Sequence, residues 1–350
     1  MLTKKFKIKI FNILRQSFII LLISFTLIIS IELFVKFFIY EKYTVKIIQG
    51  FVMPDDDLIW KLDPELGKKY YNGAFKVNEI GFRDNSYNEN AETKILILGD
   101  SVSWGHKIFN YKLTYTYMLE KFIEKTTKKH IEVINASVPG YSTFQHLDYL
   151  KNHGLKLKPD IIILQFSLND VFERYNTVAQ FGGDAFFLGI DTRNSIKGLK
   201  GWLIRNSHLY EMLMKGILKI YKKKENYKIN NLLVDNPSSE IIDAWNLTLS
   251  EIDEIHNVAK LHNIPFVVMI APHEIQLYKN NNNQPQVIIK NHARKNNFEV
   301  LNLLQFFYSN YKRNNKIQLF VDDNHFSETG HFLTAMSLHV FLSRNFLNKL

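Results

Sequence analysis

The sequence predicts an α/β fold, in which a doubly wound, mainly parallel five-stranded sheet forms a three-layer α/β/α domain behind an N-terminal transmembrane helix. Three observations predict it. From residue 94 onward, short β-rich runs alternate with stretches whose apolar residues recur every three or four positions, the pattern of repeated βα units. The segment DIIILQFS at 160–167 contains a continuous apolar run, which is typical of a parallel strand covered on both faces. Ahead of the domain lies one long, unbroken apolar segment.

The expected strands and helices follow one another along the domain. The helix expected at 238–263 has a serine at its cap and an acid near its first turn, which together mark a helix start. In such sheets, ligands collect at the carboxyl ends of the strands, which is where Gly99–Ser101, Asn135–Gly140 and Asn169–Asp170 fall. The strands are expected at 95–98, 131–137, 160–167, 264–272 and 298–303, and the helices at 112–129, 143–157, 238–263, near 285–296 and from about 328.

The composition is that of a globular chain with a basic balance. The chain has 350 residues, a formal charge of +10 and no cysteine, which excludes a disulfide framework, a thiolate metal site and a lipid-modified cysteine. The lysines are scattered and thicken only at 4–9 and 215–228, without an RNA- or DNA-binding signature beside them. The charge therefore indicates a solvated or phospholipid-facing surface, with no nucleic-acid partner.

An apolar segment near the N-terminus predicts a membrane anchor. Residues 18–35 carry a single charge, Glu32, and as a helix they would span roughly 27 Å, close to the thickness of a bilayer core. A cleaved signal peptide and a buried core helix are the alternatives, but no small-x-small site follows the segment and it is apolar all round. By the positive-inside rule the N-terminus stays in the cytoplasm and the rest of the chain lies outside, because the segment follows Lys4, Lys5, Lys7, Lys9 and Arg15.

These features divide the chain into four parts. We expect a basic cytoplasmic N-terminus at 1–16, a transmembrane signal anchor at 17–39, an extended connector packed on the domain at 40–93, and the α/β domain at 94–350. Within the domain, 171–236 is expected to be an insertion or a lid. The domain is then periplasmic or extracellular, attached to the cell membrane by a single span.

One hydroxyl and a distant pair of residues indicate nucleophilic chemistry. Ser101 follows the apolar run in KILILGDSVSWG at 94–105, at a helix start where backbone amides stabilise negative charge. A serine hydroxyl needs a base to attack at neutral pH, and that base needs an orienting partner. Asp322 and His325, three residues apart in LFVDDNHFSETGH, supply such a pair. The Gly-x-Ser-x-Gly elbow of α/β-hydrolases is absent from the sequence.

Four blocks in this sequence resemble, in order, those of the SGNH (GDSL) hydrolase family in its bacterial membrane-anchored form. The stretch VNEIGFRDN at 77–85 is similar to one often found ahead of the first block in such members, and the whole resemblance covers 77–345. It implies an SGNH-hydrolase, flavodoxin-like sheet. The blocks are GDS at 99–101 with Gly105 behind it, NASVPGYS at 135–142, SLND at 167–170, and DDNH at 322–325 followed by Gly330 and His331.

The resemblance implies a role for each matching residue. Ser101 is the nucleophile, His325 is the general base and later the general acid, and Asp322 orients the imidazole. The backbone amides of Ser101 and Gly140 and the side-chain amide of Asn169 line the oxyanion hole, which needs two or three donors that are already in position.

Other positions carry open alternatives. The third block begins with Ser167 where the family usually has glycine, and a side chain there is expected to narrow the site or to tilt Asn169. Asp323 is the alternative partner for His325. Three residues are expected either to wall the substrate pocket or to pack in the core, namely Trp104, His106 and Tyr141. Structural roles are expected for Asp100, which ties the turn, for Asn135 and Asp170 as network residues, and for His331 against the last helix.

The expected function is ester hydrolysis through an acyl-enzyme on Ser101. The expected substrates are O-acylated envelope carbohydrates or lipid esters, and no metal or cofactor is expected. Two alternatives use the same fold: an O-acyltransferase with the same triad, and a non-catalytic glycan-binding or assembly protein. No oligomeric state is predicted.

Overall fold

The computed structural model describes residues 4–39, 52–55, 57–62, 77–172, 178–181, 184–187, 199, 203, 207–210, 212–213, 229–278 and 282–347. Most of the expected insertion at 171–236 and much of the expected connector at 40–93 lie outside the described residues. A five-stranded sheet forms the centre of the domain in the order β4-β3-β5-β8-β9, and all neighbouring strands are parallel. This confirms the predicted doubly wound sheet. Its strands are β3 (Thr93–Gly99), β4 (Ile131–Ser137), β5 (Ile161–Phe166), β8 (Phe266–Ile270) and β9 (Glu299–Asn302).

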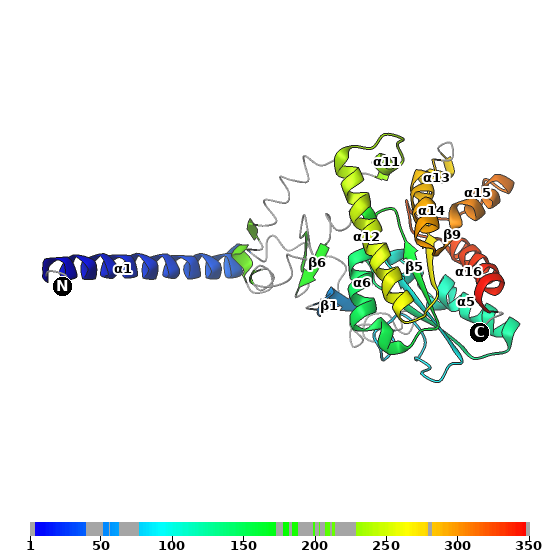
Figure 1. Ribbon diagram of the computed structural model, residues 1–350, viewed down its shortest axis with the longest axis horizontal. Coiled ribbons are helices and arrows are strands. Elements are labelled where there is room, and N and C mark those ends of the chain that lie inside the picture. Colours follow the sequence, from blue (N-terminus) through cyan, green and yellow to red (C-terminus); the bar gives the residue numbers. More distant parts are fainter. Residues whose placement is uncertain are drawn as a thin grey trace.

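Helices cover both faces of this sheet, so the domain has the three expected layers (Figure 1). One face packs against α6 (Thr143–Asn152), α12 (Ser239–Leu261) and α14 (Gln284–Asn296). The other face packs against α5 (Tyr115–Thr127), α15 (Leu303–Arg313) and α16 (Glu328–Leu342). Shorter helices are α4 (Ser101–Trp104), α11 (Ile229–Leu232), α13 (Ile275–Tyr278) and 3₁₀ turns at Tyr111–Leu113 and Gly154–Leu157.

The central strand shows why the sheet needs two covered faces. Successive side chains of a strand point to opposite faces. Accordingly Leu96 and Leu98 pack in the core beneath α6 and α12, while Ile95 and Ile97 pack in the core beneath α5 and α16. All four are fully buried, and burial of each such side chain is worth about 1.5–3 kcal/mol. The apolar run therefore requires helices on both sides.

The registers bring three strand ends to one edge of the sheet. Gly99 at the end of β3 lies opposite Ser137 at the end of β4, and Leu98 lies opposite Leu164 of β5. The strand order reverses between β3 and β5, and in doubly wound sheets ligands bind in the crevice at such a switch point. The segments that follow these three strands, the first three sequence blocks, therefore lie together.

The structure adds a helix that the sequence analysis did not include. Helix α15 begins directly after β9, where Asn302 caps it by accepting a hydrogen bond from the Leu304 N–H at 3.0 Å. It buries Leu303, Leu304 and Phe307, an i, i+1, i+4 spacing that marks one helical face. No turn residue separates α15 from β9. The apolar pattern is therefore continuous from the strand into the helix, and the sequence does not mark where the helix begins.

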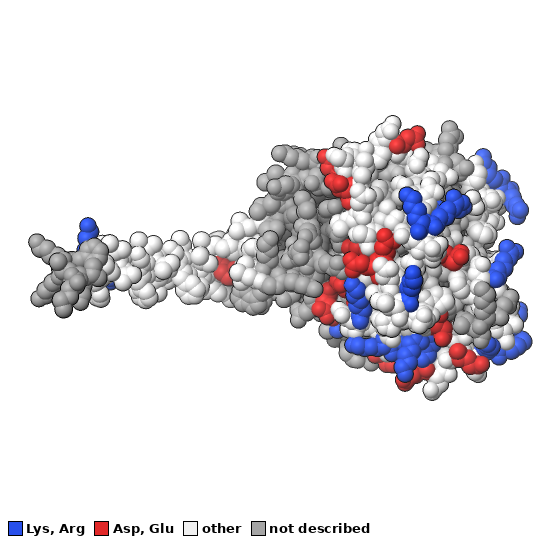
Figure 2. Space-filling view, viewed as in Figure 1, with Lys and Arg blue, Asp and Glu red and all other residues white. Residues whose placement is uncertain are grey.

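The apolar N-terminal segment forms one long helix, α1 (Lys4–Phe34), which continues as a π-helical turn (Val35–Ile39). It projects from the domain (Figure 1), and Figure 2 shows a shaft nearly free of charged side chains, whereas Lys, Arg, Asp and Glu are interspersed on the visible face of the domain. In the part of the chain that the structure describes, this is the one helix long and apolar enough to cross a membrane. Only 6% of its most apolar window is buried, so it is not a core helix of the domain.

Glu32, the single charge of the apolar run, is held by the segment that begins at Ser207. Its carboxylate accepts hydrogen bonds from the Ser207 hydroxyl at 2.7 Å and from the backbone N–H groups of His208 at 2.6 Å and Leu209 at 3.1 Å. A carboxylate at such a point satisfies the unpaired amides of a helix start. Residues 207–209 of the expected insertion therefore contact the end of α1 nearest the domain.

Segments ahead of β3 also pack on the domain. A two-stranded antiparallel pair, β1 (Val52–Asp55) and β2 (Ile59–Leu62), contacts α6, where the Gln145 side chain donates to the Leu58 carbonyl at 2.9 Å. In the stretch 77–92, Asn88 N–H donates to the Glu132 carboxylate at 3.0 Å. A second antiparallel pair comprises β6 (Val178–Phe181) and β7 (Asp184–Phe187).

Glu132 makes the stability of this packing dependent on pH. Burial, together with the nearby Glu120 carboxylate, raises the pKa of Glu132 from its ordinary value of 4.5 to about 7, against the Asn88 hydrogen bond that favours the charged form. An acid whose pKa is raised on folding binds its proton more tightly in the folded state, so its contribution favours folding at low pH and is lost as pH rises from about 4.5 to about 7.

We therefore expect Glu132→Gln to raise the free energy of unfolding by about 1–2 kcal/mol at pH 8 and to change it little at pH 4. Thermal unfolding at the two pH values measures this difference. Glu89→Gln, at an exposed position of the same segment, is the control and should have little effect at either pH. An equal change for Glu132→Gln at both pH values would contradict the prediction.

Candidate active site

Ser101 is positioned by a tight turn at the end of β3. Asp100 caps the short helix α4, accepting a hydrogen bond from the Val102 N–H at 2.8 Å, as the sequence analysis expects. A Cβ atom at Gly99 would lie 2.6 Å from the Ser103 hydroxyl and 2.8 Å from Gln165 Oε1, so only glycine fits there. Ser101 is therefore the first residue of the helix, with Asp100 as its cap.

His325 and Asp322 lie on a loop that closes on itself just before α16. Phe320 and Phe326 form an isolated antiparallel bridge across the loop, and the Val321 N–H donates to the His325 carbonyl at 2.9 Å. The Phe326 ring packs on Phe307 of α15, with centroids 4.8 Å apart. The loop is thus anchored to a helix that the sequence analysis did not predict.

Gly330 lets this loop approach the start of α16. A Cβ at Gly330 would lie 2.3 Å from the Leu319 carbonyl oxygen, which no real side chain tolerates. Ser327 caps α16 through the Gly330 N–H at 3.1 Å and donates its hydroxyl hydrogen to the Gln318 carbonyl at 2.7 Å. The spacing between loop and helix is thereby set by three contacts within one short segment.

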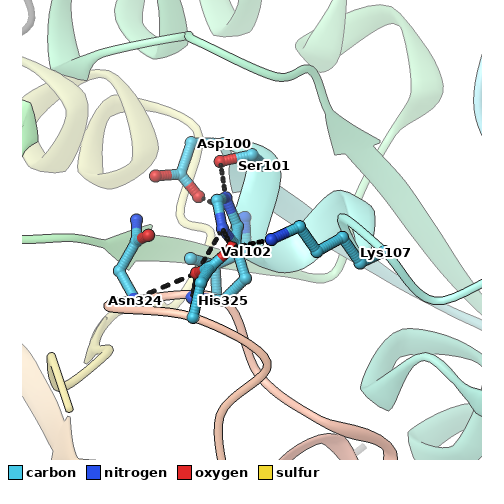
Figure 3. A network of polar contacts seen from close by, with 7 residues as sticks. Asp100, Ser101, Val102, Lys107, Asn324 and His325 are labelled. Carbon is cyan, nitrogen blue, oxygen red and sulfur yellow. Dashed lines mark hydrogen bonds and ion pairs between the residues drawn. The ribbon is translucent and has the colours of Figure 1, made fainter.

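The three predicted triad residues form a continuous chain of hydrogen bonds (Figure 3). His325 Nε2 lies 2.8 Å from Ser101 Oγ, and His325 Nδ1 lies 2.8 Å from Asp322 Oδ1 and 3.0 Å from Oδ2. The His325 N–H also donates to Asp322 Oδ1 at 3.0 Å. The alternative partner, Asp323, has an exposed side chain, and its backbone carbonyl accepts the Glu274 N–H at 2.8 Å.

Lys107 joins the outer side of this chain. Its Nζ lies 2.7 Å from Asp322 Oδ2, so the carboxylate is shared between an imidazole and an ammonium group. Burial opposes the charge on Asp322, but the hydrogen bond from Lys107, the His325 N–H and the charge of the His325 ring together hold the pKa of this carboxyl well below its usual range. Asp322 is therefore ionised throughout the neutral range.

Two further histidines lie near His325. The His106 ring is 4.3 Å from the His325 ring, and burial followed by the charge of His325 lowers the pKa of His106 to about 4. His273 follows β8 and is 5% exposed, and burial followed by the charge of His325 lowers its pKa to about 4 as well. Both are neutral at pH 7. His273 is not among the site residues predicted from the sequence, although a polar residue just beyond a strand of this sheet is a usable signal.

The expected oxyanion donors lie at three adjacent strand ends. Gly140 has φ +81° in a turn with Pro139 before it, closed by the Tyr141 N–H donating to the Val138 carbonyl at 3.1 Å. Glycine is favoured there because the third position of this turn requires a positive φ. The Val138 N–H donates to the Gly99 carbonyl at 3.1 Å, which ties the turn to the end of β3. Asn169 is half-buried in the turn after β5.

A buried polar network joins these strand ends from beneath. Gln165 Oε1 accepts the Asp100 N–H at 3.2 Å and the Ser103 hydroxyl at 2.8 Å, and Gln165 Nε2 donates to Ser167 Oγ at 2.6 Å. The Asp100 carboxyl lies beside this network, and burial raises its pKa against the hydrogen bond that it accepts from the Val102 N–H. Polar groups this deep require such pairing.

This network includes the side chain of Ser167, the serine that replaces the usual glycine of the third block. The Ser167 side chain is 1% exposed and is held between the ends of β3 and β5, beneath the surface rather than in the site. Asp170 accepts the Ser167 N–H at 2.9 Å, and Asn135 donates to the Ser103 carbonyl at 3.2 Å and to Thr116 Oγ1 at 3.3 Å. Asp170 and Asn135 thus hold the surrounding backbone, as expected of network residues.

The three pocket candidates separate in the structure. Trp104 is 6% exposed and Tyr141 is 1% exposed, and both belong to the hydrophobic core, which favours the packing alternative for these two. His106 is only half-buried and contacts the His325 ring. His331 is fully buried on α16, where its Nδ1 accepts the Tyr115 N–H at 3.2 Å.

One group of side chains has the composition of a metal site. In the described part of the chain, His106, Asp322 and His325 each offer a ligand atom, and these atoms lie within 4.8 Å of one another. Ligands of a tetrahedral zinc ion at its usual bond lengths lie closer, about 3.4 Å apart. The hydrogen bonds that His325 and Asp322 make to Ser101 and Lys107 already account for their proximity.

Comparisons with known proteins place the chain in a family. The model of the GDSL-like lipase/acylhydrolase family matches residues 97–333. A search of curated proteins found no match. Among solved structures, a two-domain esterase active on acetylated mannans, crystallised with mannopentaose, is 14% identical with a TM-score of 0.45, over 72% of this chain and 49% of that one. This chain therefore spans about half the length of that esterase.

Two other solved structures are similar to a comparable degree. A mutant acetyl-xylooligosaccharide esterase from Geobacillus is 14% identical with a TM-score of 0.45, over 72% of this chain and 94% of that one. A lipase/acylhydrolase from Enterococcus faecalis is 14% identical with a TM-score of 0.43, over 72% of this chain and 96% of that one. The family match is the stronger finding, because it covers more than half of the chain and includes all four sequence blocks. The chain belongs to the GDSL-like lipase/acylhydrolase family, whose members are ester hydrolases.

Proposed function

We propose that this protein is a serine hydrolase that cleaves carboxylic esters through an acyl-enzyme on Ser101. The observation that carries the proposal is the unbroken chain from Ser101 Oγ through the His325 ring to the Asp322 carboxylate, with links of 2.8 Å. A serine, an imidazole and a carboxylate in this order activate the hydroxyl for attack at neutral pH. Membership of an ester hydrolase family gives the reaction class.

The first half of the reaction forms the acyl-enzyme. Ser101 Oγ attacks the ester carbonyl carbon while its proton passes to His325 Nε2, and the carbonyl electrons move onto oxygen. The carbonyl then re-forms as the bond to the leaving alkoxide breaks, and His325 returns the proton to that oxygen as the alcohol departs. Asp322 holds Nδ1–H toward itself, so that Nε2 is the nitrogen free to take the proton.

The second half releases the acid. Water occupies the place of the alcohol, gives a proton to His325 Nε2 and attacks the acyl carbon. The tetrahedral intermediate collapses, and Ser101 Oγ leaves with the proton from His325. In both halves the oxyanion is stabilised by the backbone N–H groups of Ser101 and Gly140 and by the Asn169 amide. Asn169 is a neutral donor and needs no protonation.

The proposed setting is the outer face of a cell membrane. Helix α1 acts as a retained anchor, with the basic residues 1–16 in the cytoplasm and the domain outside. A helix of this length and mean hydropathy supports this assignment. The substrates in that setting are O-acyl groups of envelope carbohydrates or lipid esters, and the residues of the site supply the nucleophile, base and oxyanion donors without a cofactor.

The acyl-enzyme is tested with a fluorophosphonate probe, which phosphonylates an activated serine. We expect the full-length protein to be labelled and Ser101→Ala to be unlabelled, because the probe reacts with Ser101 Oγ. The control is Ser103→Ala, which removes a fully buried hydroxyl two residues away and should leave labelling in place. Labelling of Ser101→Ala at the wild-type level would refute the assignment.

The assignment of the acid is tested by Asp322→Asn. An asparagine keeps the shape but favours the wrong imidazole tautomer, so kcat for ester hydrolysis should fall about 1,000- to 10,000-fold. The matched control is Asp323→Asn, which should change kcat less than about threefold, since an exposed surface carboxylate makes a small contribution. The reverse ranking of the two variants would assign the role to Asp323.

The oxyanion hole is tested by Asn169→Ala. Loss of one donor should lower kcat about 100- to 1,000-fold with little change in KM, because the donor acts on charge that develops in the transition state. Asn324→Ala removes an amide from the rim of the triad loop and serves as the control. A rise in KM at unchanged kcat would instead make Asn169 a substrate-binding residue.

A further inference from the structure

Arg83 lies beneath the site and is contributed by the segment ahead of the domain. It belongs to the 77–85 stretch and lies outside residues 97–333, the range that the family model matches. Its side chain is 2% exposed. A deeply buried arginine is tolerated only where its N–H groups have hydrogen-bond partners. The residues that accept these hydrogen bonds therefore show which segment Arg83 fixes in place.

Those partners are backbone carbonyls on both sides of one loop. Arg83 Nη1 donates to the carbonyls of Trp104 and Gly105, both at 2.8 Å. Arg83 Nη2 donates to the carbonyls of Ile108 and Phe109, the latter at 3.1 Å. The guanidinium also stacks over the Trp104 ring, 4.6 Å from its centroid. The planar guanidinium can reach several carbonyls at once, which a lysine ammonium on its flexible stem cannot reproduce.

Two residues of this loop, His106 and Lys107, contact the triad residues. His106 lies against the His325 ring at 4.3 Å, and Lys107 Nζ lies 2.7 Å from Asp322 Oδ2. Lys107 has φ +63°, a left-handed backbone conformation that a side chain adopts only when its surroundings impose it. The four carbonyls that Arg83 binds lie immediately before and after this pair.

We infer that Arg83 is a positioning residue, which holds the loop 104–109 so that the Lys107 ammonium contacts the outer oxygen of Asp322. This rests on the proposed function of Ser101, His325 and Asp322. It makes Arg83 part of the support of the catalytic residues, although this arginine precedes the first sequence block.

The consequence for the reaction is electrostatic. His325 Nδ1 contacts both oxygens of Asp322, at 2.8 Å and 3.0 Å, and Lys107 contacts Oδ2 at 2.7 Å. The ammonium opposes the positive charge that the imidazole takes up when it accepts the Ser101 proton, and it keeps Asp322 ionised. The charged and titratable groups around His325 are Asp322, Lys107 and the two neutral histidines 106 and 273, with the buried Asp100 behind Ser101. Lys107 is thus the cation that Arg83 brings to this group.

The test is the pH profile of kcat/KM for hydrolysis of p-nitrophenyl acetate by the full-length protein in detergent. Lys107→Met should move the acidic limb to higher pH by about half to one unit, because a cation near the imidazole is removed. Arg83→Lys keeps a positive charge but cannot bind four carbonyls, and it should move the limb in the same direction. The double variant should shift the acidic limb no further than Lys107→Met does, because the two substitutions remove the same interaction, the contact between Lys107 and Asp322.

A control variant in the stretch 77–92 distinguishes the positioning of Lys107 by Arg83 from a general destabilisation of that stretch. Asn78→Ala removes the hydrogen bonds from the Phe82 N–H at 2.9 Å and to the Asn85 carbonyl at 2.8 Å, in the same turn but away from the loop. It should lower the melting temperature without moving the limb. A wild-type profile for Arg83→Lys, a double variant whose shifts add in full, or an equal shift for Asn78→Ala would each overturn the inference.

A measurement without substrate separates this inference from the proposed function. In the protein labelled with ¹⁵N-histidine, the titration of the His325 ring should move to higher pH in both Arg83→Lys and Lys107→Met. If this occurs while p-nitrophenyl acetate turnover is the same in Ser101→Ala as in the wild type, the proposed function fails and the positioning stands. If the titration is unchanged in Arg83→Lys but Ser101→Ala is inactive, the positioning fails and the function stands.

Discussion

The hydrogen bond between Ser101 Oγ and His325 Nε2 joins two segments that are 224 residues apart, and most of the architecture around it serves to keep that distance at 2.8 Å. On the serine side, the close approach at Gly99 and the cap by Asp100 set the position of the hydroxyl. On the histidine side, Gly330 lets the loop rest against the start of α16. Proton transfer between heavy atoms needs this range of distance, so small errors on either side would be costly.

The charges of the site are few and are arranged around one carboxylate. Asp322 is ionised and is shared by His325 and Lys107, whereas burial keeps His106 and His273 neutral at pH 7. A second carboxyl, Asp100, lies behind Ser101, where burial raises its pKa although one of its oxygens accepts the Val102 N–H at 2.8 Å. In the proposed reaction, the positive charge that forms on the imidazole has one opposing charge close by and one adjacent cation that moderates it.

The sheet and the proximity of Ser101, His325 and Asp322 could be predicted from the sequence because their signals are local. Strand β4 has the predicted bounds, since its apolar run ends at turn residues. Ser101, Asp322 and His325 belong to short motifs, and the parallel order of the strands brings those motifs together. In contrast, α15 follows β9 without a turn. The change from the two-residue repeat of a strand to the 3.6-residue repeat of a helix therefore falls within one apolar stretch, where it is not visible in the sequence.

The supporting residues could not be predicted because their partners are distant in sequence or are backbone atoms. Arg83 binds carbonyls, which leave no trace in the sequence, and Lys107 is an isolated lysine 215 residues from Asp322. Ser167 illustrates the converse case. A departure from the expected glycine suggested a change in the site, but its hydroxyl joins the buried network between β3 and β5. Which side of the strand end a side chain takes depends on the buried groups around it, here on Gln165 of the same strand.

Ser101 is proposed to carry the acyl group during turnover, and rapid quenching followed by mass spectrometry detects that group where it is bound. The full-length protein is mixed with p-nitrophenyl acetate, quenched in acid during the first turnover and digested with a protease. The account predicts a burst of p-nitrophenol and one acetyl group on the peptide that contains Ser101. Steady turnover in which the acetyl group is found on another residue, or with no burst and no acetylated peptide at any quench time, would contradict it.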